Sequence, residues 1–154
     1  MNRHLVAMVW SLLLSLFLLM PSALAATSAD AICGQWYTKD KDALVEIFQD
    51  GETFAGKIVW LSEKSATDEN GNPALDDNNP DPELAKQPIV GLRLAHSFTH
   101  VGGNDWEGGF IYDPESGKTY KCLMELKKGG KELKVKGFIG ISLIGRSEYW
   151  TRKQ

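Results

Sequence analysis

The strongest constraint in this sequence is a succession of short segments in which apolar and polar residues alternate. Such alternation is typical of half-buried β-strands, and no segment of ten or more residues after position 26 has the period of an amphipathic helix. Tight antiparallel turns are indicated by Asp50-Gly51, by Gly129-Gly130 and by the run from Pro114 to Gly117. The predicted strands cover residues 35–39, 43–49, 53–62, 89–98, 105–113, 118–127, 131–139 and 143–152.

Eight successive strands with short connections predict an all-β fold, an eight-stranded antiparallel up-and-down barrel. Closure pairs the last strand with the first and leaves no sheet edge exposed. The interior of such a barrel is either filled by its own side chains or holds one small ligand. A sandwich of two sheets is the alternative architecture. In the barrel, the first strand begins and the last strand ends at the same end, and the long polar loop 63–88 lies at the opposite rim.

The first 25 residues predict a secretory signal peptide. Arg3 precedes an uncharged, mostly apolar run over 5–20, and Ala23-Leu24-Ala25 has the form of a cleavage site. The run is shorter than the about 20 residues that a spanning helix needs, which favours cleavage over a retained anchor. We therefore expect a periplasmic or secreted protein with one domain, residues 26–154, and no membrane span after cleavage.

The net charge and the motifs of the sequence argue against several classes of function. The formal net charge is −3, and this mild acidity argues against a nucleic-acid or anionic-membrane surface, which needs clustered Lys and Arg. The sequence has no Gly-x-Ser-x-Gly element and no phosphate loop. Asp68 begins a run like a calcium loop, but Pro73 replaces its turn glycine and Asn79 replaces its final Glu. We expect no enzyme activity, no cofactor and no metal.

Two cysteines follow the predicted leader, Cys33 and Cys122. An even number of cysteines in an exported protein suggests a disulfide between them. The alternative is two separate buried thiols.

The candidate ligand-binding residues are large aromatic and charged side chains assigned to the inner face of the barrel. Arg146 and Glu148 alternate in phase with Trp150, so both charges enter the barrel if Trp150 does. They then either pair with each other or hold the acidic group of a ligand. The full set is Trp60, Trp106, Phe110, Tyr112, Arg146, Glu148 and Trp150. The alternative is a barrel filled by these rings.

The polar loop 63–88 is a candidate lid over the barrel mouth, with Asp77, Asn79 and Asp81 at its centre. The alternative is a rigid loop in which Asn, Asp and Pro only satisfy turn geometry.

The chain resembles two known groups of proteins. Gly34-Gln35-Trp36 resembles the G-x-W signature of lipocalins, in which a basic residue of the last strand lies over the tryptophan; Arg152 stands at that place. The chain also resembles a bacterial exported family, domain of unknown function 2147. That resemblance rests on segments in order along the chain, among them 56–61, 77–82, 88–92, 106–114, 116–120, 136–140 and 143–150. It implies a lipocalin-like fold, with Gly34, Trp36 and Arg152 as structural residues, and no established activity.

Two functional hypotheses follow. The first is an exported binding module that holds an apolar or amphipathic small molecule. The second is a packed barrel that acts through its surface as an envelope interaction or accessory protein. The sequence leaves the oligomeric state open.

Overall fold

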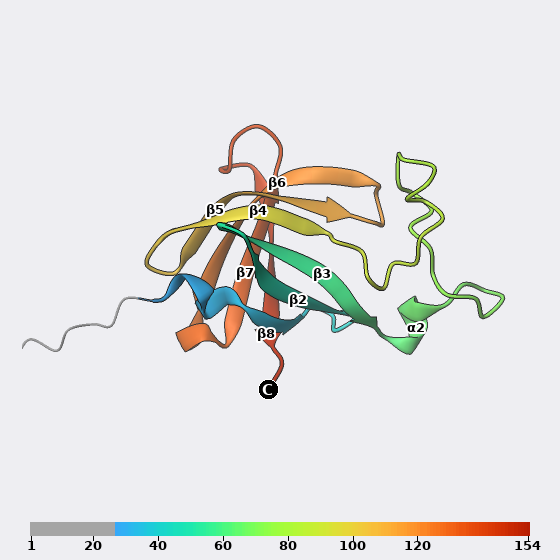
Figure 1. The fold of residues 1–154 in the computed structure, drawn as a ribbon, viewed down its shortest axis with the longest axis horizontal. Helices are drawn as coiled ribbons and strands as arrows, with labels where there is room; N and C mark the ends of the chain where they lie inside the picture. The colour runs from blue at the N-terminus through green and yellow to red at the C-terminus, as the bar shows by residue number, and fades with distance from the viewer. Residues whose placement is uncertain (1–26) are drawn as a thin grey trace, which may run out of the picture.

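Eight strands, each paired with its neighbours in the sequence, close into one barrel (Figure 1). This computed structural model describes residues 27–154, so the predicted signal peptide and its cleavage site lie outside the described residues. Two 3-10 turns, η1 (Ala29–Ile32) and η2 (Lys128–Gly130), and the short helix α2 (Glu63–Ala66) accompany the strands. The strands are β1 (Gly34–Tyr37), β2 (Ala43–Asp50), β3 (Thr53–Leu61), β4 (Ala95–Gly102), β5 (Asp105–Asp113), β6 (Lys118–Lys127), β7 (Glu132–Phe138) and β8 (Gly145–Arg152).

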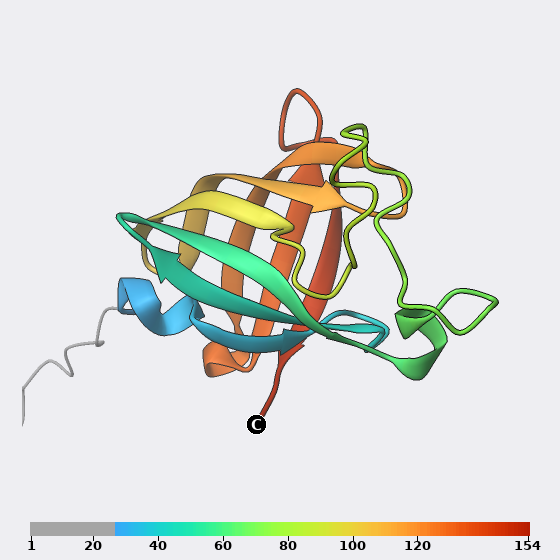
Figure 2. The same cartoon turned by 45° about the vertical axis from the view of Figure 1, so that its right-hand side comes forward.

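The predicted eight-stranded antiparallel up-and-down barrel is confirmed. β1 and β8 close it as an antiparallel pair, with Trp36 opposite Arg152 and Tyr37 opposite Thr151. We call the end that holds η1, η2 and Arg152 the closed end, and the opposite end the mouth. The β3–β4 loop (62–94), the β5–β6 turn (114–117) and the β7–β8 loop (139–144) all lie at the mouth (Figure 2).

The predicted position of the fourth strand is wrong, because β4 begins at Ala95 and not at residue 89. Gly91 has φ +101°, and the Leu92 amide donates to the Ile89 carbonyl, so a turn interrupts the alternation. The segment still runs beside β3, since Ile58 exchanges backbone hydrogen bonds with Leu92 and Gly91. It is an irregular approach to β4.

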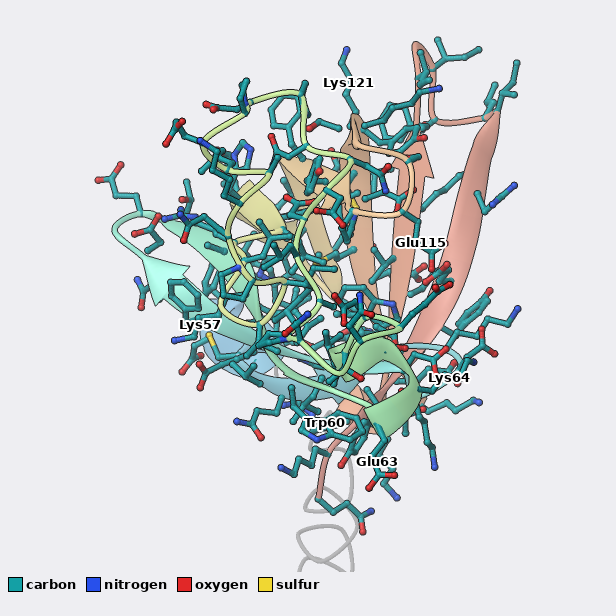
Figure 3. All side chains as sticks on the ribbon, turned by 90° about the vertical axis from the view of Figure 1, so that its right-hand side faces the viewer. Lys57, Trp60, Glu63, Lys64, Glu115 and Lys121 are labelled. Atoms are coloured by element: carbon teal, nitrogen blue, oxygen red, sulfur yellow. The ribbon has the colours of Figure 1, made fainter. Side chains whose placement is uncertain are left out.

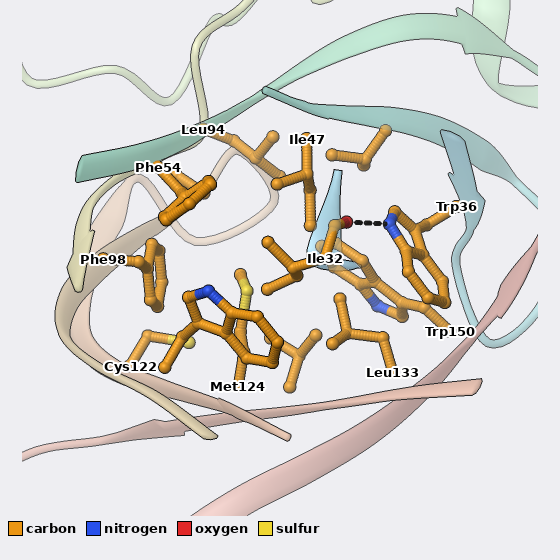
Figure 4. Packing of buried hydrophobic residues seen from close by; sticks show 14 of the residues in the cluster. Ile32, Trp36, Ile47, Phe54, Leu94, Phe98, Cys122, Met124, Leu133 and Trp150 are labelled. Carbon is orange, nitrogen blue, oxygen red and sulfur yellow. Dashed lines mark hydrogen bonds between the residues drawn. The ribbon is translucent and has the colours of Figure 1, made fainter. Parts of the chain in front are cut away.

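The closed end is packed around two tryptophans. Trp36 and Trp106 are fully buried, and each indole N–H donates to a carbonyl of η1. Trp36 donates to Ile32 at 2.9 Å (Figure 4), and Trp106 donates to Ala29 at 3.1 Å. Buried Trp side chains need such a partner for the indole N–H. The apolar cluster continues up the barrel through Ile47, Phe54, Phe98, Met124, Leu133 and Trp150.

The predicted disulfide is wrong, because both cysteines are free thiols. Cys33 lies at the closed end just before β1, whereas Cys122 lies within β6, and β7 and β8 separate those two strands. Cys122 is buried in the core, and this burial raises the pKa of its thiol to about 12. It is therefore a packed apolar residue, as the alternative interpretation proposed.

Arg152 ties the closed end together. Its guanidinium lies 4.1 Å from the centre of the Trp36 ring, and it donates to the carbonyls of Ala31, Cys33 and Gly130 at 2.6 to 2.8 Å. Gly34 makes room for it, because an added Cβ would lie 2.8 Å from Arg152 Nη1 and φ is +129°. These contacts are the physical basis of the structural role that the resemblance to lipocalins implies for Gly34, Trp36 and Arg152.

We predict that Arg152→Leu destabilises the fold by about 3–5 kcal/mol, because several charge-assisted hydrogen bonds are lost and carbonyls are left without donors. Urea unfolding measures the change. Arg93→Leu is the matched control: Arg93 pairs with Asp50 on the surface, both about half exposed, so its loss costs less than about 1 kcal/mol. Equal effects of the two substitutions would contradict the role of Arg152.

Candidate functional site

The candidate site is the interior face of the barrel at the mouth, where two charged residues of β8 lie. In the β7–β8 pairing, Glu148 stands opposite Val135 and Arg146 opposite Gly137. Val135 and Trp150 are buried and define the interior face, so Arg146 and Glu148 project from that same face. Both are nevertheless exposed. The interior face is therefore open to solvent at this end.

The wall beside these charges is partly apolar. Gly137 contributes no side chain, and a Cβ added there would lie 3.6 Å from Cβ of Tyr120 and 3.8 Å from Cγ2 of Ile111. Ile111 and Tyr120 are half-buried and belong to the neighbouring strands β5 and β6. Apolar side chains of β5 and β6 therefore belong to the same interior face as Arg146.

The two charges do not form an ion pair with each other. Glu148 Oε2 accepts a hydrogen bond from the Trp150 indole at 3.3 Å. Arg146 has no ion-pair partner among residues 27–154. Its guanidinium keeps all its donors, in a fork that matches a carboxylate or a phosphate.

Trp60 does not belong to this interior. It is 43% exposed and its ring meets Tyr37 edge-on, with centroids 6.1 Å apart. The β2–β3 register explains why the prediction for Trp60 is wrong. Val45 pairs with Ile58 but Leu44 pairs with Trp60, so β3 has one extra residue there. This bulge turns Trp60 outward (Figure 3), and Leu61 is buried instead.

Phe110 and Tyr112 are also placed outside the barrel. Between the pairs Trp106–Met124 and Gly109–Cys122, β5 has one residue more than β6. Gly108, with φ +75°, accommodates this bulge. Trp106 stays inside, but beyond the bulge Gly109 and Ile111 take the interior positions. The Gly108-Gly109 pair is the signal that strict alternation overlooks.

The β3–β4 loop is fastened to the β5–β6 turn. The Tyr112 hydroxyl donates to Asp76 Oδ1 at 2.8 Å, and Asn79 Nδ2 donates to Asp76 Oδ2 at 2.7 Å. Asn78 Nδ2 donates to the carbonyls of Pro114 and Glu115. Asp76 is 1% exposed and accepts hydrogen bonds from both Tyr112 and Asn79. We call these contacts of the β3–β4 loop the latch. No motif in the sequence distinguishes Asp76 from the other acidic residues of the loop.

The three predicted lid residues differ in what they do. Asn79 holds Asp76, Asp81 accepts the Glu83 amide at 2.8 Å, and Asp77 is exposed. Two of them thus stabilise turns, as the rigid-loop alternative proposes. Asp68 has a similar task, because hydrogen bonds from Asn72 and Asn70 lower its pKa. In the part of the chain that the structure describes, no group of three His, Cys, Asp or Glu is placed to hold a metal.

A separate hollow of about 540 Å³ lies at the closed end, outside the barrel. Ala31, Leu126 and Lys131 are among the residues that line it, together with Arg152. The Arg152 guanidinium is already engaged by three carbonyls. The hollow therefore offers a ligand few free polar contacts.

The fold and the mouth together define a lipocalin-like eight-stranded barrel. A family described as "Uncharacterized protein conserved in bacteria (DUF2147)" matches residues 34–152, and the chain belongs to this family. Protein HP1028 from Helicobacter pylori, described as a member of the lipocalin family, has a similar structure: TM-score 0.66, 22% identity, 80% of this chain and 83% of that chain covered. At this identity the similarity shows the fold. No curated protein matches the chain.

We predict that Tyr112 ionises at a higher pH in the folded protein than in the unfolded chain. Burial, followed by the hydrogen bond to Asp76, raises its pKa to about 12, whereas an unfolded tyrosine ionises near pH ~10. The folded state thus retains the proton longer, so this stabilisation is complete below pH ~10 and is lost as the pH rises through about 12.

A tyrosinate absorbance titration measures this ionisation. Tyr112→Phe should remove a component with a midpoint at about pH 12, and Tyr149→Phe, on the exposed face of β8, should leave that component in place. If the component persists in Tyr112→Phe, the latch contact between Tyr112 and Asp76 is not formed as described.

Proposed function

We propose that this protein is a binding module for an amphipathic small molecule with an acidic head group, which it takes up at the mouth of the barrel. The observation that carries the proposal is the Arg146 guanidinium, which lies on an exposed interior face above the buried Trp150. A charge on the inner wall of a barrel is costly unless it meets water, a partner or a ligand. The lipocalin-like fold supports the same class of function, since barrels of this size can hold one small ligand.

The geometry suggests how such a ligand would be oriented. Its apolar part would contact Ile111, Tyr120 and Trp150, and its carboxylate or phosphate would accept hydrogen bonds from Arg146. Glu148 would favour ligands that offer a hydroxyl or amide donor beside the acidic group. The lower barrel is filled by the core, so the ligand would sit in the mouth rather than deep inside. We expect binding without chemical conversion.

We expect this activity in the periplasm or outside the cell, because the first 25 residues predict a signal peptide. The ligand would then be one that the cell envelope supplies or collects. In the part of the chain that the structure describes, no helix is long and apolar enough to cross a membrane.

We predict that Arg146→Met weakens the binding of a fluorescent long-chain fatty acid about tenfold or more, because a charge-assisted hydrogen bond is lost. The methyl ester of the same fatty acid should bind both proteins equally, since it has no charge for Arg146 to meet. Arg93→Met is the control, because Arg93 is a half-exposed arginine that pairs with Asp50 on the outer surface. Fluorescence titration gives the dissociation constants. Equal weakening of acid and ester, or none, would reject Arg146 as the anchor.

Native mass spectrometry of the protein purified from its own cell envelope separates this proposal from the packed-barrel alternative. A small molecule that leaves on denaturation, and that Arg146→Met loses, supports the binding module. Repeated isolation of the bare chain, together with no binding of the fatty acid, would favour a barrel that acts through its surface.

A further inference from the structure

The β7–β8 loop carries an apolar tip at the mouth. It projects beyond the strands as the orange-red loop of Figures 1 and 2. Large exposed aliphatic side chains in such a cluster mark a surface that meets something apolar. The four that form the tip are Ile139, Ile141, Leu143 and Ile144, between 59% and 86% exposed.

Basic side chains lie next to this tip on the outer wall. Lys121 stands opposite Phe138 in the β6–β7 pairing, and Lys136 stands opposite Leu123. Lys136 extends along the hairpin toward the tip, because a Cβ added at Gly145 would lie 2.9 Å from its Cε. Neither lysine has an ion-pair partner among residues 27–154.

The acidic side chains of the adjacent elements lie away from the tip itself. Glu148 is on the interior face, and Glu115 is on the β5–β6 turn, apart from Lys121 in Figure 3. Glu107 and Glu125 line a hollow that Lys136 also borders, and they lie on the halves of β5 and β6 nearer the closed end. The mild acidity of the whole chain is therefore not a property of this part of the rim. The net charge of the whole chain predicts that the protein has no surface for an anionic membrane. The two lysines beside the tip argue against that prediction.

We propose that the β7–β8 tip docks the protein on an anionic lipid bilayer, with the aliphatic side chains in the interface and Lys121 and Lys136 at the headgroups. The tip is convex and its large exposed side chains are all aliphatic, so it suits insertion into a fluid surface better than a fitted protein groove. The flanking unpaired lysines supply the attraction to anionic headgroups that shallow insertion requires. This docking does not depend on the mouth holding a ligand.

The test is cosedimentation of the protein, purified as the cell processes it, with vesicles of phosphatidylglycerol and phosphatidylcholine. Wild type should bind these vesicles, less so at high salt, and should bind pure phosphatidylcholine weakly. Leu143→Ser with Ile144→Ser should reduce binding at least tenfold. Lys121→Gln and Lys136→Gln should each reduce it about fivefold.

Matched controls come from the closed end. Val101→Ser removes an exposed aliphatic side chain, and Lys131→Gln with Lys153→Gln removes two exposed cations; all should bind like wild type. None of the substituted positions is buried, so circular dichroism should show the same fold throughout. Failure of wild type to bind anionic vesicles would overturn the proposal, and so would tip variants that bind as well as wild type. The proposal would also be overturned if the protein does not bind vesicles and its tip instead binds a polypeptide.

Discussion

Closure of this barrel depends on a short contact that Arg152 reinforces. β1 has four residues and meets β8 at two paired positions. Backbone pairing alone gives such a contact few hydrogen bonds, so the guanidinium adds three to carbonyls of the flanking segments and covers the Trp36 ring. Burial lowers the pKa of Arg152, but guanidinium has an ordinary pKa so high that the side chain stays charged. Its carbonyl partners are the compensation that a partly buried cation needs.

Because the packed core lies at the closed end, the residues at the mouth can be polar or charged. The tryptophans and η1 fill the lower barrel, so the interior face higher up need not be apolar for the fold to be stable. The β3–β4 loop at the mouth is mostly polar, and hydrogen bonds hold it in place. Asp76 and Asn78 attach it to β5 and the β5–β6 turn, and Gly117 passes so close to Asn78 that an added Cβ would lie 2.1 Å from its carbonyl oxygen.

The sequence predicts the architecture because alternation is uninterrupted in β6, β7 and β8. There, one correctly placed residue fixes the direction of all the others, and Trp150 in this way places Arg146 and Glu148 on the interior face. The same inference fails in β3 and β5, because one bulge residue reverses every side chain beyond it, and so Trp60 and Phe110 turn outward. The disulfide prediction is wrong for a different reason: cysteine number carries no information on whether two strands are neighbours.

The β7–β8 hairpin brings the two proposed contacts together. Alternation sends Arg146 and Glu148 into the mouth and sends Lys136 and Phe138 outward, while the turn between the strands carries the apolar tip. Seven paired positions join the two strands of this hairpin, so its tip and the side chains on its inner face belong to one hydrogen-bonded unit. Docking through the tip would therefore hold the mouth at the lipid surface, where amphipathic molecules with acidic heads are concentrated. Gly137 stands opposite Arg146 in this hairpin, so no side chain of β7 faces the guanidinium at that position.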